Sequence, residues 1–245
     1  MNKFCIIIPC YRHAIFIPGI LAKLNSFNLP VIIVDDGNIP EDQKSLEGLA
    51  RNKNNIYLIS YQPNRGKGYA FTMGLKKAAE LGYTHAIQLD ADGQHNISDL
   101  NRIMEISEGH PCDLVSGAPL YDESAPFARR FFRKLTTFFC RVETLSSEIK
   151  DAMIGFRSYP VRETLSLITS CHISNRMNFD IEIMVRLKWK GIHIKFFDTR
   201  IIYPENGISN FKVLRDNFYL SMLHTKLCTL MILTLPYRIY INATK

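Results

Sequence analysis

The feature that most constrains the fold of this chain is an alternation of short, continuous apolar runs with segments of helical periodicity. Continuous apolar runs are typical of strands that are covered on both faces. The runs predicted as strands are residues 4–9, 31–34, 56–61, 85–90 and 113–117. The helices predicted between them are residues 15–27, 69–81 and 97–107. Strands that alternate with helices in this way predict parallel β-α-β units with right-handed crossovers.

The second half of the chain departs from this alternation. The elements expected there are a helix over 125–142, a helix over 178–189, strands at 192–197 and 200–203, and a C-terminal helix pair that breaks at Pro236. The sequence therefore predicts an α/β protein with a mostly parallel, Rossmann-like sheet, flanking helices and a helical C-terminal extension. In such open sheets, ligands bind beyond the carboxyl ends of the strands.

Charge limits the class of partner. The chain has 245 residues and a formal net charge of +7, which favours an anionic partner such as a phosphorylated substrate, an acidic lipid or nucleic acid. No nucleic-acid recognition motif accompanies the cations, so we expect no nucleic-acid partner.

Cysteine usage and hydropathy indicate the compartment. The six cysteines form no Cys-x-x-Cys pair and several lie in apolar runs, which predicts reduced, mostly buried thiols. The first residues enter a strand without the length of a signal peptide. The apolar run Leu227–Leu235 is shorter than the roughly 18 residues of a spanning helix. We expect a cytoplasmic protein whose membrane contact, where it occurs, is peripheral on the cytoplasmic face.

Two carboxylates, Asp90 and Asp92, end the run at residues 85–90. Residues two apart on a strand point to the same side, so the carboxylates converge if the strand geometry persists that far. Their repulsion favours a divalent cation, and Mg²⁺ combines one or two protein carboxylates with phosphate and water. The pattern predicts a metal-diphosphate site. A solvated acidic turn is the competing interpretation, because Asp-x-Asp triplets are common.

Two other loops follow predicted strands. Asp35 and Asp36 come after residues 31–34, where one carboxylate can accept a hydrogen bond from a ribose or a base, although a plain Asp-Gly turn fits as well. Arg65 and Lys67 lie in a loop with two glycines that opens a predicted helix. Glycine lets backbone N–H groups approach an anion, and the helix N-terminus adds positive charge. The loop lacks the Walker ending, and no dinucleotide glycine pattern follows the first strand.

These loops occur in a characteristic order. It runs Ile8-Pro9-Cys10-Tyr11, then Val34-Asp35-Asp36-Gly37, then Asn64-Arg65-Gly66-Lys67-Gly68, then Leu89-Asp90-Ala91-Asp92-Gly93-Gln94. In this order and spacing, about the first 210 residues resemble the family-2 glycosyltransferases with the GT-A fold. The resemblance is greatest to the branch that includes dolichol-phosphate mannosyltransferase and related polyprenyl-phosphate glycosyltransferases.

The resemblance implies an inverting transfer of a sugar from a UDP- or GDP-sugar to a lipid-linked or other cell-envelope glycan acceptor. It implies Mg²⁺ or Mn²⁺ as cofactor, with Asp90 and Asp92 as its ligands. The residues that it assigns to the nucleotide-sugar are Pro9, Tyr11, Asp35, Asp36, Asn64, Lys67, Gly68, Asp90, Ala91 and Asp92.

The resemblance also divides the chain. Residues 1–212 form the glycosyltransferase domain, with a nucleotide-binding half at about 1–118 and an acceptor-side half at 119–212, and residues 213–245 form the helical extension. The segment at 203–211 resembles the family's late Gly-x-Ser loop, which tends to lie over the diphosphate.

The acceptor side carries the candidate base. The segment from Asp151 to Arg157 resembles the family's Asp-x-x-x-Gly-Phe-Arg segment. The family resemblance assigns Arg157, and Gln94 in the earlier loop, to the acceptor or to a phosphate. A structural ion pair between Arg157 and Asp151 is the alternative role for Arg157. Transfer to a hydroxyl needs a carboxylate base, whereas a phosphate acceptor is already ionised. Our order of candidates is Asp180, Asp151 and then Glu182, and helix capping is the competing role for Asp180.

A basic-aromatic segment covers residues 125–142. Its apolar residues at three- and four-residue spacing are Phe127, Phe131, Leu135, Phe138 and Phe139, and cations fill the other faces. Such an amphipathic helix suits an anionic membrane surface, or it packs its aromatic stripe on the sheet and leaves the basic face in water.

Two other functions stay open. A sugar-phosphate nucleotidyltransferase also combines an α/β sheet with a metal-binding Asp, but its glycine-rich first loop is replaced here by Pro9-Cys10-Tyr11. A non-catalytic nucleotide-sugar-binding scaffold would keep the fold without turnover.

Overall fold

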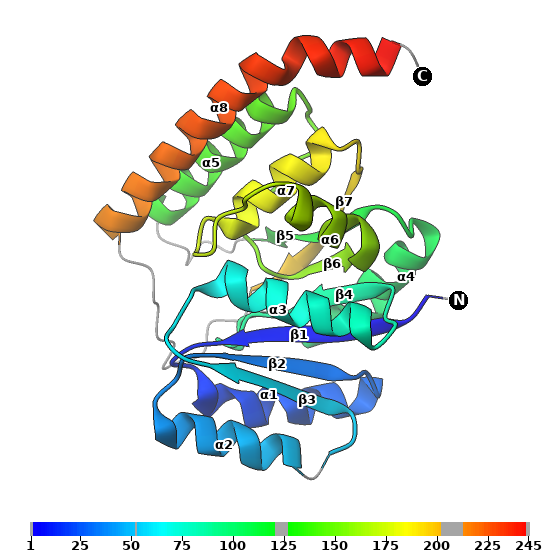
Figure 1. The fold of residues 1–245 in the computed structure, drawn as a ribbon, viewed down its shortest axis with the longest axis vertical. Coiled ribbons are helices and arrows are strands. Elements are labelled where there is room, and N and C mark those ends of the chain that lie inside the picture. Colours follow the sequence, from blue (N-terminus) through cyan, green and yellow to red (C-terminus); the bar gives the residue numbers. More distant parts are fainter. Residues whose placement is uncertain (1, 52, 121–126, 202–212, 244–245) are drawn as a thin grey trace.

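The computed structural model describes residues 2–51, 53–120, 127–201 and 213–243. They contain a seven-stranded sheet of order β3-β2-β1-β4-β6-β5-β7 (Figure 1). The strands are β1 Phe4–Cys10, β2 Val31–Asp36, β3 Ile56–Tyr61, β4 His85–Gln88, β5 Leu114–Leu120, β6 Arg157–Pro160 and β7 Ile194–Arg200. Only β6 is antiparallel to its neighbours, β4 and β5. The predicted α/β fold with a mostly parallel sheet is confirmed.

Helices cover both faces of this sheet (Figure 1). They are α1 Ile17–Leu24, α2 Pro40–Arg51, α3 Lys67–Glu80, α4 Leu100–Gly109, α5 Phe127–Thr144, α6 Val161–Ser170, α7 Phe179–Trp189 and α8 Val213–Ala243. Successive side chains of β1 serve the two layers: Ile6 and Ile8 pack with α1, α2 and α4, whereas Ile7 packs with α3, α6 and α7. This two-sided burial explains why the first strands are continuously apolar.

Three elements escaped the sequence prediction. Helix α2 begins with Pro40, followed by Glu41 and Asp42, which are favourable residues for a first turn. Strand β6 is buried but reads Arg-Ser-Tyr-Pro, so it has no apolar run that would reveal it. Helix α6 follows it directly.

The end of the sheet also differs from the prediction. One strand, β7, replaces the two expected at 192–197 and 200–203, and Ile201 forms only an isolated bridge with His95. The late loop at 203–211 lies outside the described residues.

The aromatic face of α5 does not pack on the sheet. Phe131, Leu135 and Phe138 are exposed, which contradicts the expected packing of the aromatic stripe. The buried face is polar instead and consists of Thr136, Thr137, Cys140, Glu143 and Thr144. Two of these hydroxyls donate to carbonyls one turn earlier in the helix, which satisfies them internally.

Helix α8 is a single helix, so the expected helix pair broken at Pro236 is wrong. Figure 1 shows that it lies beside α5 and changes direction in its last third. Its segment Asn217–Leu235 is long and apolar enough to cross a membrane, which corrects the expectation that no segment reaches this length. Only 28% of that segment is buried.

Candidate active site

Lys67 is the centre of a charged cluster at the carboxyl ends of the strands. Its Nζ lies 2.6 Å from Asp90 Oδ1 and 2.6 Å from Asp180 Oδ2. Lys67 begins α3, Asp90 follows β4 and Asp180 lies in the first turn of α7, so the fold brings three distant segments together. The site lies beside β1. On one side of β1 the sheet continues with β2 and β3, and on the other side with β4, so the strand order reverses here. Open α/β sheets bind ligands at such a switch point.

The charges of this cluster stabilise one another. Burial lowers the pKa of Lys67, but the Asp180 and Asp90 carboxylates raise it further, so the net shift is upward. Burial raises the pKa of Asp90, but Lys67 and His95 hold it well below its usual value. The site therefore contains a fixed cation between two acidic side chains, one of which is held ionised far below neutral pH.

Two polar residues that the sequence did not single out complete the cluster. Gln88, fully buried on β4, donates its Nε2 hydrogen to Asp180 Oδ1 at 3.0 Å. His95 Nε2 lies 3.3 Å from Asp90 Oδ2, and its ring stacks on Phe156. A buried glutamine inside an apolar strand was the available sequence signal, because such a side chain needs a hydrogen-bond partner.

Gly155 leaves the room that Asp90 occupies. A Cβ atom at this position would lie 2.5 Å from both carboxylate oxygens of Asp90. A carbon atom this close would displace the oxygens. Asp90 can therefore keep its observed position only if residue 155 has no side chain. Gly155 lies in the segment that resembles the family's Asp-x-x-x-Gly-Phe-Arg pattern, which predicts no role for it at the site.

A turn presents the second carboxylate. Strand β4 ends at Gln88, so Asp90 and Asp92 do not converge through strand geometry as expected. Asp92 Oδ1 accepts a hydrogen bond from the Gln94 N–H at 3.0 Å, and Gly93 supports the turn with a φ of +72°. Within the described parts of the chain, this is the only hydrogen bond or ion pair of the Asp92 carboxylate. Two oxygen-donating carboxylates, one of them with spare acceptor capacity, fit Mg²⁺ or Mn²⁺.

Asp35 and Asp36 have different environments. Asp35 Oδ1 accepts from the N–H of Asn38 at 2.9 Å and from its Nδ2 at 2.7 Å, while Asp35 Oδ2 is buried and has no donor among the residues that the structure describes. Asn38 also accepts from the Arg12 N–H and donates to the Cys10 carbonyl, so it ties this loop to the end of β1. Asp35 therefore keeps an acceptor that a nucleoside N–H or O–H can satisfy.

Asp36 organises the loop before α3. Its carboxylate accepts from the Tyr61 hydroxyl at 2.9 Å, Asn64 Nδ2 at 2.7 Å, the Arg65 N–H at 2.7 Å and the Gly66 N–H at 2.8 Å. Four donors use its acceptor capacity. Asn64 Nδ2 is one of these donors, so the contacts of Asp36 and Asn64 with the nucleotide-sugar stay a prediction.

The backbone of this loop is not an open anion cradle. The Gly68 and Tyr69 N–H groups donate to the Asn175 carbonyl at 2.8 and 3.2 Å. A Cβ at Gly68 would lie 2.6 Å from Phe179 Cβ, so this glycine allows close packing of α3 on the loop before α7. Gly68 thus has a packing role, and its assignment to the nucleotide-sugar stays a prediction.

Four further assignments concern residues near the end of β1 and the metal loop. Pro9 and Tyr11 are half-buried there, next to the β2 loop that holds Asp35. The Ala91 side chain packs in the hydrophobic layer with α1 and α4, which leaves only its backbone for a ligand. Gln94 is half-buried and contributes its N–H to the Asp92 turn.

Arg157 is structural. It is fully buried, and its guanidinium donates to the Asp180 carbonyl at 2.5 Å and to the Ala152 carbonyl at 2.8 Å. Arg157 therefore cannot hold an acceptor phosphate in this conformation. The alternative role expected for it, an ion pair with Asp151, is not formed either, because Asp151 pairs with Arg133.

Asp151 and Glu182 are saturated and do not belong to the Lys67 cluster. Asp151 pairs with Arg133 and accepts from the N–H groups of Met153 and Ile154. The donors to Glu182 are Ser174, Arg186 and Lys226. These contacts remove both residues as candidate bases. The capping role considered for Asp180 is also wrong, because its carboxylate bonds Lys67 and Gln88 rather than helix N–H groups.

A structural role for Asp151 predicts a stability effect. Burial raises its pKa, but Arg133 and the two N–H donors lower it further, so its contribution to stability is present at neutral pH and is lost as the pH falls through the lowered pKa. Asp151→Asn should reduce the free energy of unfolding by about 3 kcal/mol, the cost of breaking a buried pair. Denaturant titration measures this loss. Full stability with selective loss of turnover would restore Asp151 as a base.

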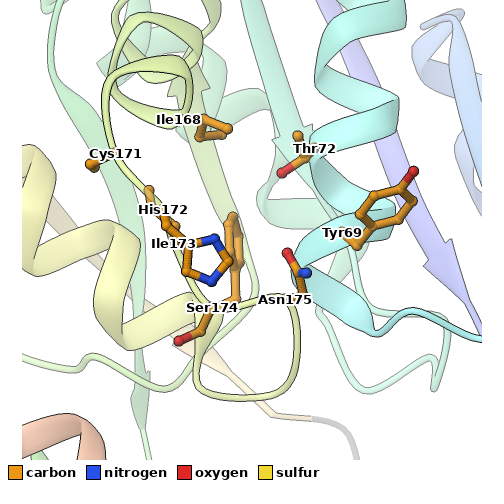
Figure 2. Close-up of a pocket in the computed structure, with 9 residues that line it drawn as sticks. Tyr69, Thr72, Ile168, Cys171, His172, Ile173, Ser174 and Asn175 are labelled. Carbon is orange, nitrogen blue, oxygen red and sulfur yellow. The ribbon is translucent and has the colours of Figure 1, made fainter.

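A cavity of about 120 Å³ lies beside the cluster, between α3 and the loop that precedes α7. Figure 2 shows Tyr69 and Thr72 on one side and His172, Ser174 and Asn175 on the other. Ligand pockets for drug-sized molecules have about 300–1,000 Å³. The cavity is therefore too small for a nucleotide-sugar.

A profile of the family described as "Glycosyl transferase family 2" matches residues 5–173. The chain is 34% identical over 221 residues to the UDP-N-acetylglucosamine--dolichyl-phosphate N-acetylglucosaminyltransferase of Methanococcus voltae, which covers 83% of this chain and 87% of that protein. It is 24% identical to the polyprenol monophosphomannose synthase of Mycolicibacterium smegmatis, with coverages of 90% and 84%.

A solved structure has the same fold. Glucosyl-3-phosphoglycerate synthase from Mycobacterium tuberculosis, in complex with Mn²⁺, uridine-diphosphate-glucose and phosphoglyceric acid, superposes with a TM-score of 0.63 at 12% identity. The match covers 94% of this chain and 79% of that one. At this identity the likeness concerns the fold alone.

Proposed function

Because this chain belongs to glycosyltransferase family 2 and is a transferase, we propose that it moves a sugar from a nucleotide diphosphate sugar to polyprenyl phosphate, with inversion at the sugar. The observation that carries the proposal is the Lys67 cluster, in which a fixed cation contacts Asp90 and Asp180 at the ligand-binding edge of the sheet, with Asp92 two residues after Asp90 in the following turn. The names of two relatives, from Methanococcus voltae and Mycolicibacterium smegmatis, support a polyprenyl acceptor.

Asp90 and Asp92 are the residues that would hold a divalent metal. When bound, the ion would neutralise charge on the departing nucleotide diphosphate. Lys67 adds a positive charge at the same place, and Asp90 and Asp180 fix its position before substrate arrives. Charges that are preorganised in a buried site stabilise a transition state without reorganisation.

The acceptor determines the role of Asp180. A polyprenyl phosphate is already ionised, so its attack on the sugar needs no general base. Both Asp180 oxygens are engaged by Lys67 and Gln88, which suits a positioning residue that orients the lysine. Asp180 would act as a base only for a hydroxyl acceptor.

Asp35 is our candidate for donor recognition. Asp35 lies at the end of β2, where its partner on β1 is Cys10, the residue between Pro9 and Tyr11, and its buried Oδ2 has no hydrogen-bond partner among the described residues. A nucleobase N–H or ribose hydroxyl would satisfy this oxygen, and a buried polar atom without a partner costs stability until it is satisfied.

The protein's surface supports peripheral contact with an anionic membrane on the cytoplasmic face. Exposed apolar residues gather on the neighbouring helices α5 and α8: Phe131, Phe132, Leu135, Phe138, Val142, Phe218, Tyr219, Met222, Ile232 and Leu233. Exposed cations on α5, such as Lys134 and Arg141, accompany them. A contiguous apolar surface with basic residues suits anionic lipid.

Contacts on the other side of α8 favour lying at the surface over crossing the membrane. Lys226 Nζ donates to Glu182 Oε1 of α7 at 2.9 Å, and His224 Nδ1 lies 2.7 Å from Glu143 Oε1 of α5. Both contacts fasten the middle of α8 to the domain. A spanning helix would have to break them.

The membrane proposal predicts a defined loss of binding. The double variant Phe131→Ser/Phe138→Ser should weaken binding to anionic vesicles at least tenfold, because burial of one Phe is worth about 1.5–3 kcal/mol. Vesicle co-sedimentation measures the change. Ile15→Ser is the matched control, since Ile15 is 79% exposed but lies outside α5 and α8. Equal losses in the control and in the double variant would contradict the assigned surface.

Donor binding tests the proposed function directly. Thermal unfolding is followed with a panel of UDP- and GDP-sugars, with and without Mn²⁺. A ligand that binds only the native state raises the melting temperature by mass action. We expect a metal-dependent rise with one nucleotide class. A folded sample that responds to none of them would contradict the donor assignment.

A further inference from the structure

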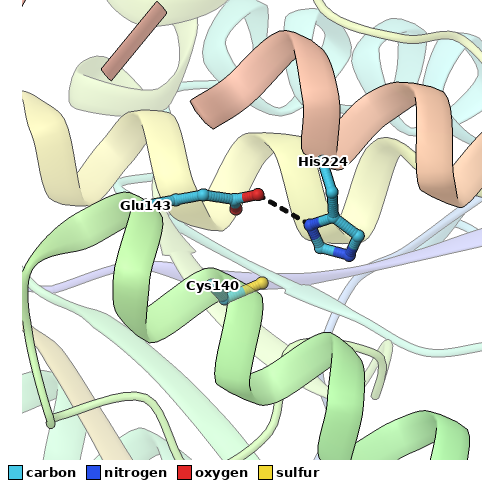
Figure 3. Close-up of side chains that lie close together, drawn as sticks. All are labelled: Cys140, Glu143 and His224. Carbon is cyan, nitrogen blue, oxygen red and sulfur yellow. Dashed lines mark hydrogen bonds and ion pairs between the residues drawn. The ribbon is translucent and has the colours of Figure 1, made fainter. Parts of the chain in front are cut away.

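A second group of reactive side chains lies on elements that the active site does not use. Cys140 and Glu143 lie on α5 and His224 lies on α8, and Figure 3 shows the three side chains converging between these helices. Their potential ligand atoms all lie within 4.8 Å of one another. All three residues are buried.

The cluster contains polar atoms without partners. His224 Nδ1 lies 2.7 Å from Glu143 Oε1, but Glu143 Oε2 and His224 Nε2 are buried and form no hydrogen bond within the described parts of the chain. Buried polar groups are almost always hydrogen-bonded, so an exception of this kind needs an explanation. A bound ion that accepts lone pairs from these atoms would explain why they lack hydrogen bonds.

Two thiols accompany the pair. Burial raises the pKa of the Cys140 thiol, and the neighbouring Glu143 raises it further, so without a cation this thiol stays protonated. Cys228 lies one helical turn after His224, and its Sγ is 3.9 Å from Glu143 Oε1. The interface between α5 and α8 thus offers sulfur, nitrogen and oxygen donors.

We propose that Cys140, Glu143 and His224 bind a zinc ion, with water as the fourth ligand. Sulfur, imidazole and carboxylate donors are the ligands that Zn²⁺ takes in proteins. With bonds of the usual length, tetrahedral ligand atoms lie roughly 3.5 Å apart. Small side-chain rotations would therefore bring the three donors onto one ion.

Charge balance agrees with this ligand set. On binding, Cys140 releases its proton to solvent, so one thiolate, one carboxylate and a neutral imidazole surround a doubly charged cation. The buried group would then carry no net charge, which avoids the cost of an unpaired charge in the interior. The ion would join α8 to α5 and is independent of the metal proposed at Asp90 and Asp92.

Cobalt substitution of the full-length protein distinguishes this site from the carboxylate site. Zinc content is first measured by mass spectrometry after purification without chelator, and Co²⁺ is then titrated into the zinc-free protein. We expect about one zinc per chain from the four-coordinate site and a thiolate-to-cobalt charge-transfer band. A carboxylate pair cannot give this band. A folded protein without bound zinc and without the band would overturn the proposal.

Matched cysteine variants locate the band. Cys140→Ser should abolish it, whereas Cys5→Ser, equally buried on β1, and Cys112→Ser, which is exposed, should keep it. If Cys140→Ser does not fold, loss of stoichiometric zinc in His224→Gln gives the same test. A band that survives in Cys140→Ser and disappears in Cys112→Ser would assign the metal to an exposed thiol and overturn the proposal.

Discussion

Asp92→Asn should lower sugar transfer about 10³-fold while the protein stays folded. The asparagine loses the charge of one proposed metal ligand, and a metal ion contributes several kcal/mol of transition-state stabilisation, of which about 4 kcal/mol corresponds to this factor. Asp92 is half-buried in a turn, and its carboxylate accepts from the Gln94 N–H, a hydrogen bond that an amide oxygen can also accept. The expected change in melting temperature is therefore small, about 2 °C or less.

The measurement compares transfer rates and thermal unfolding of the same samples. Asp198→Asn is the matched control, because Asp198 is an exposed aspartate on β7 outside the site. It should leave both quantities unchanged. If Asp92→Asn unfolded the protein, Asp92 would be structural, and if it kept full activity, the carboxylate pair would not hold the metal.

Gly155→Ala should lower transfer at least 100-fold, because the added methyl group takes the space of the Asp90 carboxylate. Asp90 would have to move away from Lys67 and His95, and a displacement of about 1 Å in a catalytic group is sufficient for a loss of this size. The variant should also weaken Mn²⁺-dependent donor binding, since Asp90 is a proposed metal ligand.

Gly48→Ala is the control for this substitution. Gly48 lies in α2, and a Cβ there meets nothing within 4 Å, so alanine should be tolerated or slightly stabilising. Asp90→Asn in the Gly155→Ala background tests the cause. If both changes act through the Asp90 carboxylate, the double variant should be no worse than Asp90→Asn alone, whereas multiplicative losses would show that Gly155 acts elsewhere.

Local sequence patterns predicted the parts of the fold that depend on one segment at a time. The continuous apolar runs of β1 and β2 follow from burial on both faces, which any central parallel strand requires. Strand β6 follows from no such pattern: it is short and polar, and it is recognised only by its pairing with β4 and β5. For α5, periodicity predicted the helix, but it could not tell which face is buried. The buried face is polar, and α5 packs against α7 and α8.

The candidate site shows the same division. The positions of Asp90, Asp92 and Lys67 near one strand edge follow from their places after strands and at a helix start. The partner of Lys67 in the cluster, Asp180, could not be predicted in this way, because it lies far away in the sequence. Lys67 and Asp180 are 113 residues apart.

The assignments that the structure corrects have a common cause. A carboxylate or guanidinium in an apolar context looks the same in sequence whether it faces a substrate or a buried partner. Asp151 is held by Arg133, and Arg157 is held by backbone carbonyls. Only the fold supplies these partners.

The most direct test of the account is transfer of labelled sugar to polyprenyl phosphate in anionic vesicles by the purified protein. The reaction uses the nucleotide-sugar identified by thermal shift, with Mn²⁺ or with a chelator. We expect label in the lipid phase that depends on Mn²⁺, on polyprenyl phosphate and on Asp92. Metal-dependent donor binding without any lipid-phase product would contradict the proposed acceptor, and product formation that persists in the chelator and in Asp92→Asn would contradict the metal-assisted mechanism.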